Sequence, residues 1–571
     1  MLALAVAVAS SGCLASFEPR SDAGATDAAA VDVGAPADAA LPAVAPLGGC
    51  SADPGSLSFR DVSDSSGVGL ASSGWGVGHQ LRALGIVDLD GLDGEDLLAV
   101  ESAGLATSRD HEAGGAQIWR TREPRCEVEP GMVRSAPLLD GASSPAYHAL
   151  AVAIGGTPRP VLFTASPDGL LAASLDGELD RLARVTLSPA GEVPMAGLAA
   201  GDVDGDGDVD IAFCTADGVT ALLAPLASAV ATRIEGSVPC TSIWLADLDA
   251  DGIPDLLTAG GTRYADGHPA EPHHPVVQLG PLLGAGLPVR LDLAGIRDDG
   301  VLVLGDFLFD GRLSVLALGT GRASGRAELR VFDIRAEGFD GEGDASGLEA
   351  SGLRSGASAS RDGAVGDLDL DGALDVLLGD LSAEGDPELA VLQGSGSPGA
   401  GLALGPVAAS LLGLPVALGG LPHVAMGDVD LDGDVDVLLP AFVRELDGER
   451  LDRVGMFING IGHARAIRVE LSGRDESPWA LGAEICAYPE GDLPEHGCQP
   501  DLSARNTLLA YRQIFASSAQ SDGRVALLGV GSSTRSVALR VVWPSVGGER
   551  ASTDLPSVPA GSSVRLRAPD Q

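Results

Sequence analysis

The chain has 571 residues and a formal net charge of −44, because 80 acidic residues outnumber 36 basic ones, all of them arginine. Such an acidic surface would repel the phosphates of nucleic acid, which excludes nucleic acid as a partner. The 79 glycines, the short apolar runs and the lack of long helical periodicity predict an all-β fold, and the length predicts two domains.

Residues 1–13 resemble the signal segment of a bacterial lipoprotein. An apolar run from Leu2 to Ala9 is followed by small residues and then by Cys13, which would become the acylated first residue of the mature chain. Ordinary secretion and a spurious start are the alternatives. Residues 14–48 are rich in Ala, Asp and Pro and predict a disordered tether. We therefore expect a protein of the bacterial cell envelope, held at the outer membrane through its lipid anchor alone, or otherwise secreted.

Four nine-residue strings carry Asp at places one, three, five and nine and Gly at place six. Carboxylates at alternate places point inward around a cation, a main-chain carbonyl at place seven adds a ligand, and glycine permits the sharp turn. Carboxylates this close would repel one another without an ion. One such string is also consistent with a solvated turn, but four copies predict calcium. The predicted ligands are Asp202, Asp204, Asp206, Asp208 and Asp210; Asp247, Asp249, Asp251 and Asp255; Asp367, Asp369, Asp371 and Asp375; and Asp428, Asp430, Asp432 and Asp436.

Three further units extend the series of strings. The first is a degenerate calcium loop that keeps acids at places one, three and nine, as Asp88, Asp90 and Asp96. The string at 306–314 keeps only places one and five, so we expect weak metal binding or none. Two apolar runs within 149–163 are typical of the same strands without a loop. Seven units with this spacing predict a propeller or a repeat array over residues 49–460. The resemblance described below implies that it is a seven-bladed β-propeller.

The cysteines indicate an oxidising compartment. Lipidation of Cys13 leaves six others, an even number. Pairing of nearest neighbours predicts the disulfides Cys50–Cys126, Cys214–Cys240 and Cys486–Cys498, although other connectivities remain open.

The strings resemble the FG-GAP or VCBS repeats of integrin-like seven-bladed β-propellers. The run from Phe59 to Val68, with residues 75–77 after it, resembles the entry to the cartilage acidic protein and ASPIC/UnbV group. Later runs resemble strands and turns of an ASPIC/UnbV module, at residues 465–473, 481–483, 512–514, 529–531 and 541–545. The resemblance implies a small β-sandwich-like domain over residues 461–571 and an extracellular binding or adhesion role, with no established reaction.

No catalytic residues are predicted. The histidines and acids of residues 266–275 are consistent with a zinc or copper site, but we interpret them as an exposed Pro-rich loop. Trp75, His79 and His463 are interpreted as structural. We expect a monomeric, calcium-stabilised, surface-tethered module that binds a protein or glycan partner. The alternative is an envelope polysaccharide lyase or hydrolase that uses the open propeller face.

Overall fold

The protein is described here from a computed structural model. The residues that the structure describes are 43–47, 57–63, 80–87, 96–102, 116–122, 131–134, 148–155, 160–166, 169–175, 182–186, 194–215, 217–225, 230–260, 275–283, 289–293, 301–320, 327–335, 338–339, 362–381, 387–397, 401–418, 424–446, 449–461, 465–475, 477–499, 507–518, 520, 525–544 and 550–569. Every element below belongs to the compact unit Pro42–Gln571. Its architecture is all-β and of the propeller type, as predicted; the helix η3 (Ala409–Leu412) is a single 3-10 turn.

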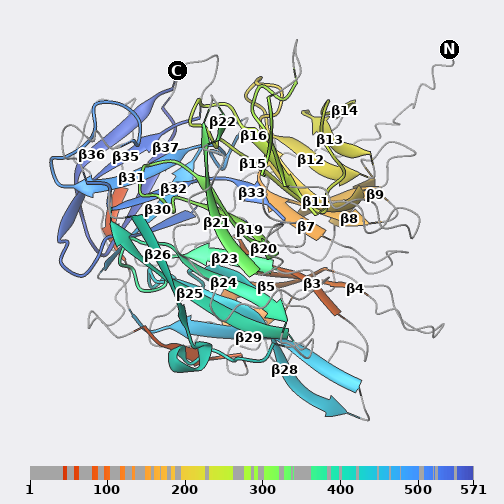
Figure 1. Cartoon of the computed structure of the whole chain (residues 1–571), viewed down its shortest axis with the longest axis horizontal. Helices are drawn as coiled ribbons and strands as arrows, with labels where there is room; N and C mark the ends of the chain where they lie inside the picture. The colour runs from red at the N-terminus through yellow and green to blue at the C-terminus, as the bar shows by residue number, and fades with distance from the viewer. Residues whose placement is uncertain are drawn as a thin grey trace, which may run out of the picture. The chain divides into compact units, whose positions relative to one another are not determined.

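In the described part of the chain, seven antiparallel sheets, each with four strands from this segment, follow one another between Phe59 and Asn459 (Figure 1). Sheet 1 contains β3 (Gln80–Val87), β4 (Asp96–Ser102), β5 (Ala116–Arg122) and β6 (Gly131–Arg134). Sheet 2 contains β7 (His148–Val152), β8 (Val161–Ser166), β9 (Gly169–Leu175) and β10 (Leu182–Thr186). Sheet 3 contains β11 (Pro194–Gly201), β12 (Asp210–Thr215), β13 (Gly218–Leu223) and β14 (Val230–Arg233). Sheet 4 contains β15 (Ser242–Ala246), β16 (Asp255–Ala259), β17 (Val276–Gln278) and β18 (Arg290–Asp292).

The last three sheets follow the same order. Sheet 5 contains β19 (Val301–Gly305), β20 (Ser314–Thr320), β21 (Ala327–Arg335) and β22 (Gly338–Phe339). Sheet 6 contains β23 (Asp362–Gly366), β24 (Asp375–Leu381), β25 (Pro387–Ser397) and β26 (Gly401–Val407). Sheet 7 contains β27 (Ala425–Gly427), β28 (Asp436–Leu446), β29 (Glu449–Asn459) and β2 (Phe59–Asp61). The number of sheets equals the number of units predicted from the sequence, and closure into a seven-bladed ring stays a prediction.

The core between the sheets is built from aliphatic side chains. Strands β12, β16 and β19 are buried along their whole length, which explains why their sequences are continuous apolar runs rather than alternating ones. One cluster joins residues of sheets 3 and 4, another joins sheets 5 and 6, and a third joins sheets 6 and 7. Hydrophobic packing of sheet on sheet therefore holds the propeller segment together.

Strand β1 and the strands after residue 460, except β33, form two more sheets. We call residues 461–571 together with β1 the tail module. One contains β1 (Ala43–Pro46), β37 (Ser562–Arg567), β30 (Ala466–Ser472) and β34 (Val525–Gly529). The other contains β32 (Ala510–Gln513), β31 (Glu484–Pro489), β35 (Ser536–Val542) and β36 (Ser552–Pro559). Buried residues from both sheets share one core cluster, as expected for a sandwich.

Strand β1 corrects one sequence-based boundary. The predicted tether extends to residue 48, whereas Ala43–Pro46 pair antiparallel with β37, from Ala43↔Arg565 to Pro46↔Ser562. The sequence Ala-Val-Ala-Pro gives no strong strand signal. It is ordered because β37 is otherwise an edge strand, whose free N–H and C=O groups accept one more partner.

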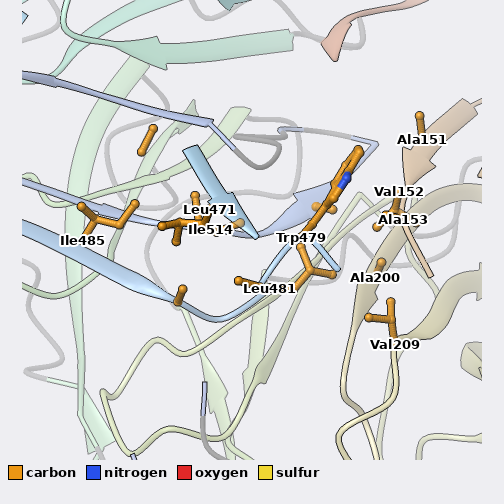
Figure 2. Packing of buried hydrophobic residues seen from close by; sticks show 14 of the residues in the cluster. Ala151, Val152, Ala153, Ala200, Val209, Leu471, Trp479, Leu481, Ile485 and Ile514 are labelled. Carbon is orange, nitrogen blue, oxygen red and sulfur yellow. The ribbon is translucent and has the colours of Figure 1, made fainter. Parts of the chain in front are cut away.

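The tail module packs directly against sheets 2 and 3. Strand β33 (Ala516–Ser517) pairs with β11, which makes sheet 3 five-stranded. Figure 2 shows the indole of Trp479 between Leu471 and Ile514 of the tail module and Val152, Ala153 and Ala200 of the propeller segment. Trp479 is only 3% exposed. The two parts therefore share a hydrophobic core.

Replacement of Trp479 by Ala should lower the free energy of unfolding by about 3–5 kcal/mol, because a large buried side chain would leave a cavity in the shared core. Denaturant unfolding followed by circular dichroism measures this change. Leu411→Ala is the control, since Leu411 is 78% exposed and its loss should change stability by at most about 0.5 kcal/mol. Equal effects of the two substitutions would contradict the packing described here.

Candidate metal centres

Each of the four predicted calcium loops connects the first strand of its sheet to the second. The 202 loop (residues 202–210) joins β11 to β12, and the 247 loop (247–255) joins β15 to β16. The 367 loop (367–375) joins β23 to β24, and the 428 loop (428–436) joins β27 to β28. In every case the ninth aspartate is the first residue of the second strand. Paired strands thus fix both ends of each loop.

The backbone turns in the same way in all four loops. Glycine at place six has a φ of 96° at Gly207 and 99° at Gly372, which confirms the predicted need for glycine. Place four is also left-handed, and Leu370 and Leu431 occupy it with φ of 56° and 59°. A left-handed conformation costs a non-glycine residue about 1–2 kcal/mol. The sequence pattern does not reveal this strain, because the residue type at place four varies.

The first aspartate of each loop organises this turn through backbone N–H groups. Asp247 accepts hydrogen bonds from the N–H groups of Asp251 at 3.0 Å and Gly252 at 2.8 Å. Asp367 accepts the equivalent bonds in its loop, again at 3.0 and 2.8 Å. These bonds hold the carboxylate at the centre of the turn and offset the strain at place four.

The ninth aspartate connects its loop to the neighbouring strands. Oδ2 of Asp375 accepts the N–H of Leu368 at 2.7 Å, and Oδ1 accepts the N–H of Gly394 at 2.7 Å. The equivalent residue Asp255 accepts the N–H groups of Leu248 and Gly280, both at 2.8 Å. The carboxylate is therefore fixed in position by two donors.

The carboxylates of each loop converge. In each of the four loops, three aspartates offer oxygens that all lie within 4.8 Å of one another. The groups are Asp202, Asp204 and Asp206; Asp247, Asp249 and Asp251; Asp367, Asp369 and Asp371; and Asp428, Asp430 and Asp436. Oδ1 of Asp369 is buried and accepts no hydrogen bond, which is unfavourable unless a cation contacts it. A donor set made only of carboxylate and backbone oxygens fits a hard divalent cation such as calcium.

Burial makes these carboxylates difficult to ionise. It raises the pKa of Asp375 to about 8, and the negative charge of Asp367 adds to the rise. Burial likewise raises the pKa of Asp255 to about 8, and the pKa of Asp210 to about 7. A positive charge among the carboxylates would favour their ionised form and reverse these shifts.

One buried acid was missed by the sequence analysis. Asp434, at place seven of the 428 loop, is fully buried. Burial and the negative charge of Asp430 make the two largest contributions that raise the pKa of Asp436, and the negative charge of Asp434 makes the third. The signal was present, because Asp208 occupies the same place in the 202 loop and was included among the predicted ligands.

The 306 loop (residues 306–314, between β19 and β20) contains an arginine that pairs with one of its own aspartates. Asp306 accepts the N–H groups of Asp310 at 3.1 Å and Gly311 at 3.0 Å, so the turn resembles that of the other loops. Arg312, at place seven, forms an ion pair of 2.6 Å with Asp310. Ser314 replaces the ninth aspartate, and its hydroxyl accepts the N–H of Phe307 at 3.2 Å. A guanidinium thus supplies the positive charge in a loop that has lost two metal ligands.

Several predicted residues lie outside the described part of the chain. They are Cys13, Cys50, Asp88, Asp90, Cys126, the 266–274 part of the predicted histidine loop, Trp75, His79 and His463. Asp96 begins strand β4. The two disulfides that fall on described residues are confirmed: Cys214–Cys240, with Cα atoms 5.3 Å apart, and Cys486–Cys498, with Cα atoms 5.6 Å apart. They indicate an oxidising, extracytoplasmic compartment. Among the described residues, no helix has the length and apolar character required to cross a membrane.

Comparison with known proteins finds no matching family model and no matching curated protein. Solved structures with a similar fold are all distant. A rhamnogalacturonan lyase of Bacillus licheniformis is 12% identical over 66% of this chain and 71% of its own, with a TM-score of 0.34. The extracellular domain of a putative hybrid two-component system from B. thetaiotaomicron is 9% identical over 70% of this chain and 39% of its own, with a TM-score of 0.35.

A third similar structure is PorZ, a surface component of the type-IX secretion system of Porphyromonas gingivalis. It is 11% identical over 86% of this chain and 59% of its own, with a TM-score of 0.34. At such identities and TM-scores, none of these similarities supports a statement about function. The resemblance to FG-GAP repeats and to the ASPIC/UnbV module stays a prediction from the sequence.

The metal-free protein should lose stability as the pH rises from about 4 to about 8. Burial raises the pKa of Asp255 and Asp375 to about 8 in the folded state, whereas an unfolded Asp titrates near 3.9. The folded state therefore binds more protons than the unfolded state in this range, and ionisation on going to higher pH destabilises it. Melting temperatures in chelator across this pH range measure the effect.

The matching control is the same pH series in excess calcium. A bound ion should favour the ionised carboxylates and remove most of the decline. A chelated protein whose melting temperature does not fall between pH 5 and pH 8 would contradict this account.

Proposed function

We propose that the protein is a calcium-stabilised extracytoplasmic module, held at the bacterial outer surface by a lipid on Cys13, that binds a protein or glycan partner. The observation that carries the calcium part is the convergence of three carboxylates in each of four loops at the same position in their sheets. When bound, the ion would neutralise carboxylates that otherwise repel one another. The loop residues themselves shape the turn and hold the oxygens in place.

The position of the tail module restricts where a partner can bind. Tail residues contact three of the loops directly. At the 247 loop, the Gln513 side chain forms hydrogen bonds with the backbone of Asp247. At the 306 loop a Cβ on Gly311 would overlap the carbonyl of Cys498, and at the 367 loop the N–H of Gly531 donates to the carbonyl of Leu370. The ends of the sheets that carry these loops are therefore occupied by the chain itself. A binding role would use surfaces away from them.

Calcium should raise the melting temperature of the wild-type protein, because a ligand that binds only the folded state stabilises it, by about 2.7 kcal/mol for each site at 100 times its Kd. Asp432→Ala should remove roughly a quarter of this gain if the four loops contribute equally. Asp217→Ala is the control, since Asp217 is an exposed acid outside the loops. Differential scanning calorimetry with calcium and with chelator gives both values. A wild-type melting temperature that changes neither with calcium nor with chelator would refute the calcium proposal.

The binding proposal is tested separately from the calcium proposal. We expect a glycan array, or titration with candidate envelope proteins, to show saturable binding, and polysaccharide turnover assays under the same conditions to show no cleavage. The alternative, an envelope polysaccharide lyase or hydrolase, predicts release of unsaturated or reducing sugar ends. Turnover by the calcium-loaded protein would replace the binding proposal with the enzymatic one.

A further inference from the structure

Arginines of the tail module approach the first aspartate of two calcium loops, the 247 loop and the 428 loop. At the 247 loop, Arg550 forms an ion pair with Asp247 and a second one, of 2.8 Å, with Glu484 of β31. A Cβ on Gly252 would overlap the Arg550 guanidinium, so the arginine lies directly on the turn. Asp247 and Glu484 are each 4% exposed in their side chains, and the ion pairs are therefore largely shielded from water.

The 428 loop has a similar neighbour. Nε of Arg468, on β30, lies 3.7 Å from Oδ2 of Asp428. The side chains are 9% and 3% exposed, so this is also a buried pair. Arg468 additionally contacts Glu470 at 3.3 Å. Because a buried charge without a partner is strongly unfavourable, each member of such a pair needs the other.

The tail backbone fits closely over the 367 loop. A Cβ on Gly529 would overlap Oδ2 of Asp367, and the N–H of Gly531 donates to the carbonyl of Leu370 at 2.9 Å. Burial raises the pKa of Asp367 to about 7, and the positive charge of Arg512 on β32 opposes that rise. The backbone of the tail module thus covers the 367 loop directly.

The 202 loop has a different environment. Asp204 and Asp206 are exposed to solvent. The pKa of Asp202 is raised by burial first and then by Asp206 and Asp204, and the N–H groups of Gly205 and Gly207 oppose the rise. Burial and the neighbouring aspartates also raise the pKa of Asp204. The string itself contains five acids, more than the four of the 247 or 367 loop.

The 306 loop shows that a guanidinium can serve such a turn. Arg312 pairs there with Asp310, while the Asp306 carboxylate still accepts the N–H groups at places five and six. The turn keeps these hydrogen bonds although Leu308 and Ser314 stand at places three and nine instead of aspartates. A single fixed positive charge is thus compatible with the turn.

We propose that Arg550 and Arg468 are built-in counter-ions of the 247 and 428 loops, so that these two loops keep their turns when calcium leaves, whereas the 202 loop depends on the ion. This inference rests on the proposed calcium binding. The two arginines are positioning residues: each acts on the first aspartate, whose carboxylate accepts the N–H groups of the turn. The tail module is then seated on the propeller segment partly by these charge pairs.

One amide in each loop reports on the turn. The N–H of the place-six glycine donates to the first aspartate in all four loops, at Gly207, Gly252, Gly372 and Gly433. Hydrogen exchange of these amides, measured by mass spectrometry on the full chain with calcium and with chelator, compares the loops within one molecule. Chelation should speed exchange at Gly207 at least tenfold more than at Gly252 and Gly433.

Arg550→Gln should make Gly252 as sensitive to chelation as Gly207, while Gly372 and Gly433 keep their wild-type behaviour. Arg550→Lys retains the charge and should restore part of the protection. Arg335→Gln is the matched control, because Arg335 is half-exposed and pairs with Asp333 outside the four calcium loops; it should change none of the four amides. The wild-type comparison alone decides the question if Arg550→Gln does not fold.

The outcomes separate the two proposals. Equal acceleration at all four glycines on chelation, or no change at Gly252 in Arg550→Gln, would overturn the counter-ion role and leave calcium binding intact. If chelation changes none of the four amides and native mass spectrometry detects no bound calcium, the calcium proposal fails, and this inference fails with it.

Discussion

Repulsion among buried carboxylates is the constraint on which the rest of the structure depends. Four loops bring three acids each into mutual contact, and burial raises the pKa of the aspartates that close them. A fold with this arrangement requires positive charge at the ends of its sheets. The chain has no lysine, and it places Arg312 within one loop and Arg550 against another. Guanidinium groups and the proposed calcium ions would both supply this positive charge.

This constraint also acts where the tail module meets the propeller segment, with which it forms one compact unit. The tail module contributes a strand to sheet 3 and Trp479 to a shared core, so its packing is largely hydrophobic. Two of its arginines, Arg550 and Arg468, nevertheless lie against loop aspartates. Gln513 adds a pair of hydrogen bonds to the backbone of Asp247, one through each side-chain atom. Hydrophobic contact holds the two parts together, and the polar contacts fix their register.

Much of this arrangement could be predicted from the sequence because it is local. Nine-residue spacing identified the four loops, apolar runs identified the strands on either side, and neighbouring cysteines identified two disulfides. The remainder depends on contacts between distant residues. Arg550 meets Asp247 across about three hundred positions, and no local pattern marks that pair. Strand β1 was missed for the same reason, since its order comes from β37 and not from its own four residues.

The position of β2 has a consequence for how the chain reaches its folded state. Phe59 pairs with Asn459, so the seventh sheet combines residues separated by four hundred positions. Contacts at such sequence separation form slowly, because a long chain must first be brought back on itself. Strand β2 leaves the ribosome long before β29, so it has no pairing partner until almost the entire propeller segment has been synthesised. Completion of the last sheet is therefore a late event in folding, and a chain shortened before residue 449 would lack the strand to which β2 pairs.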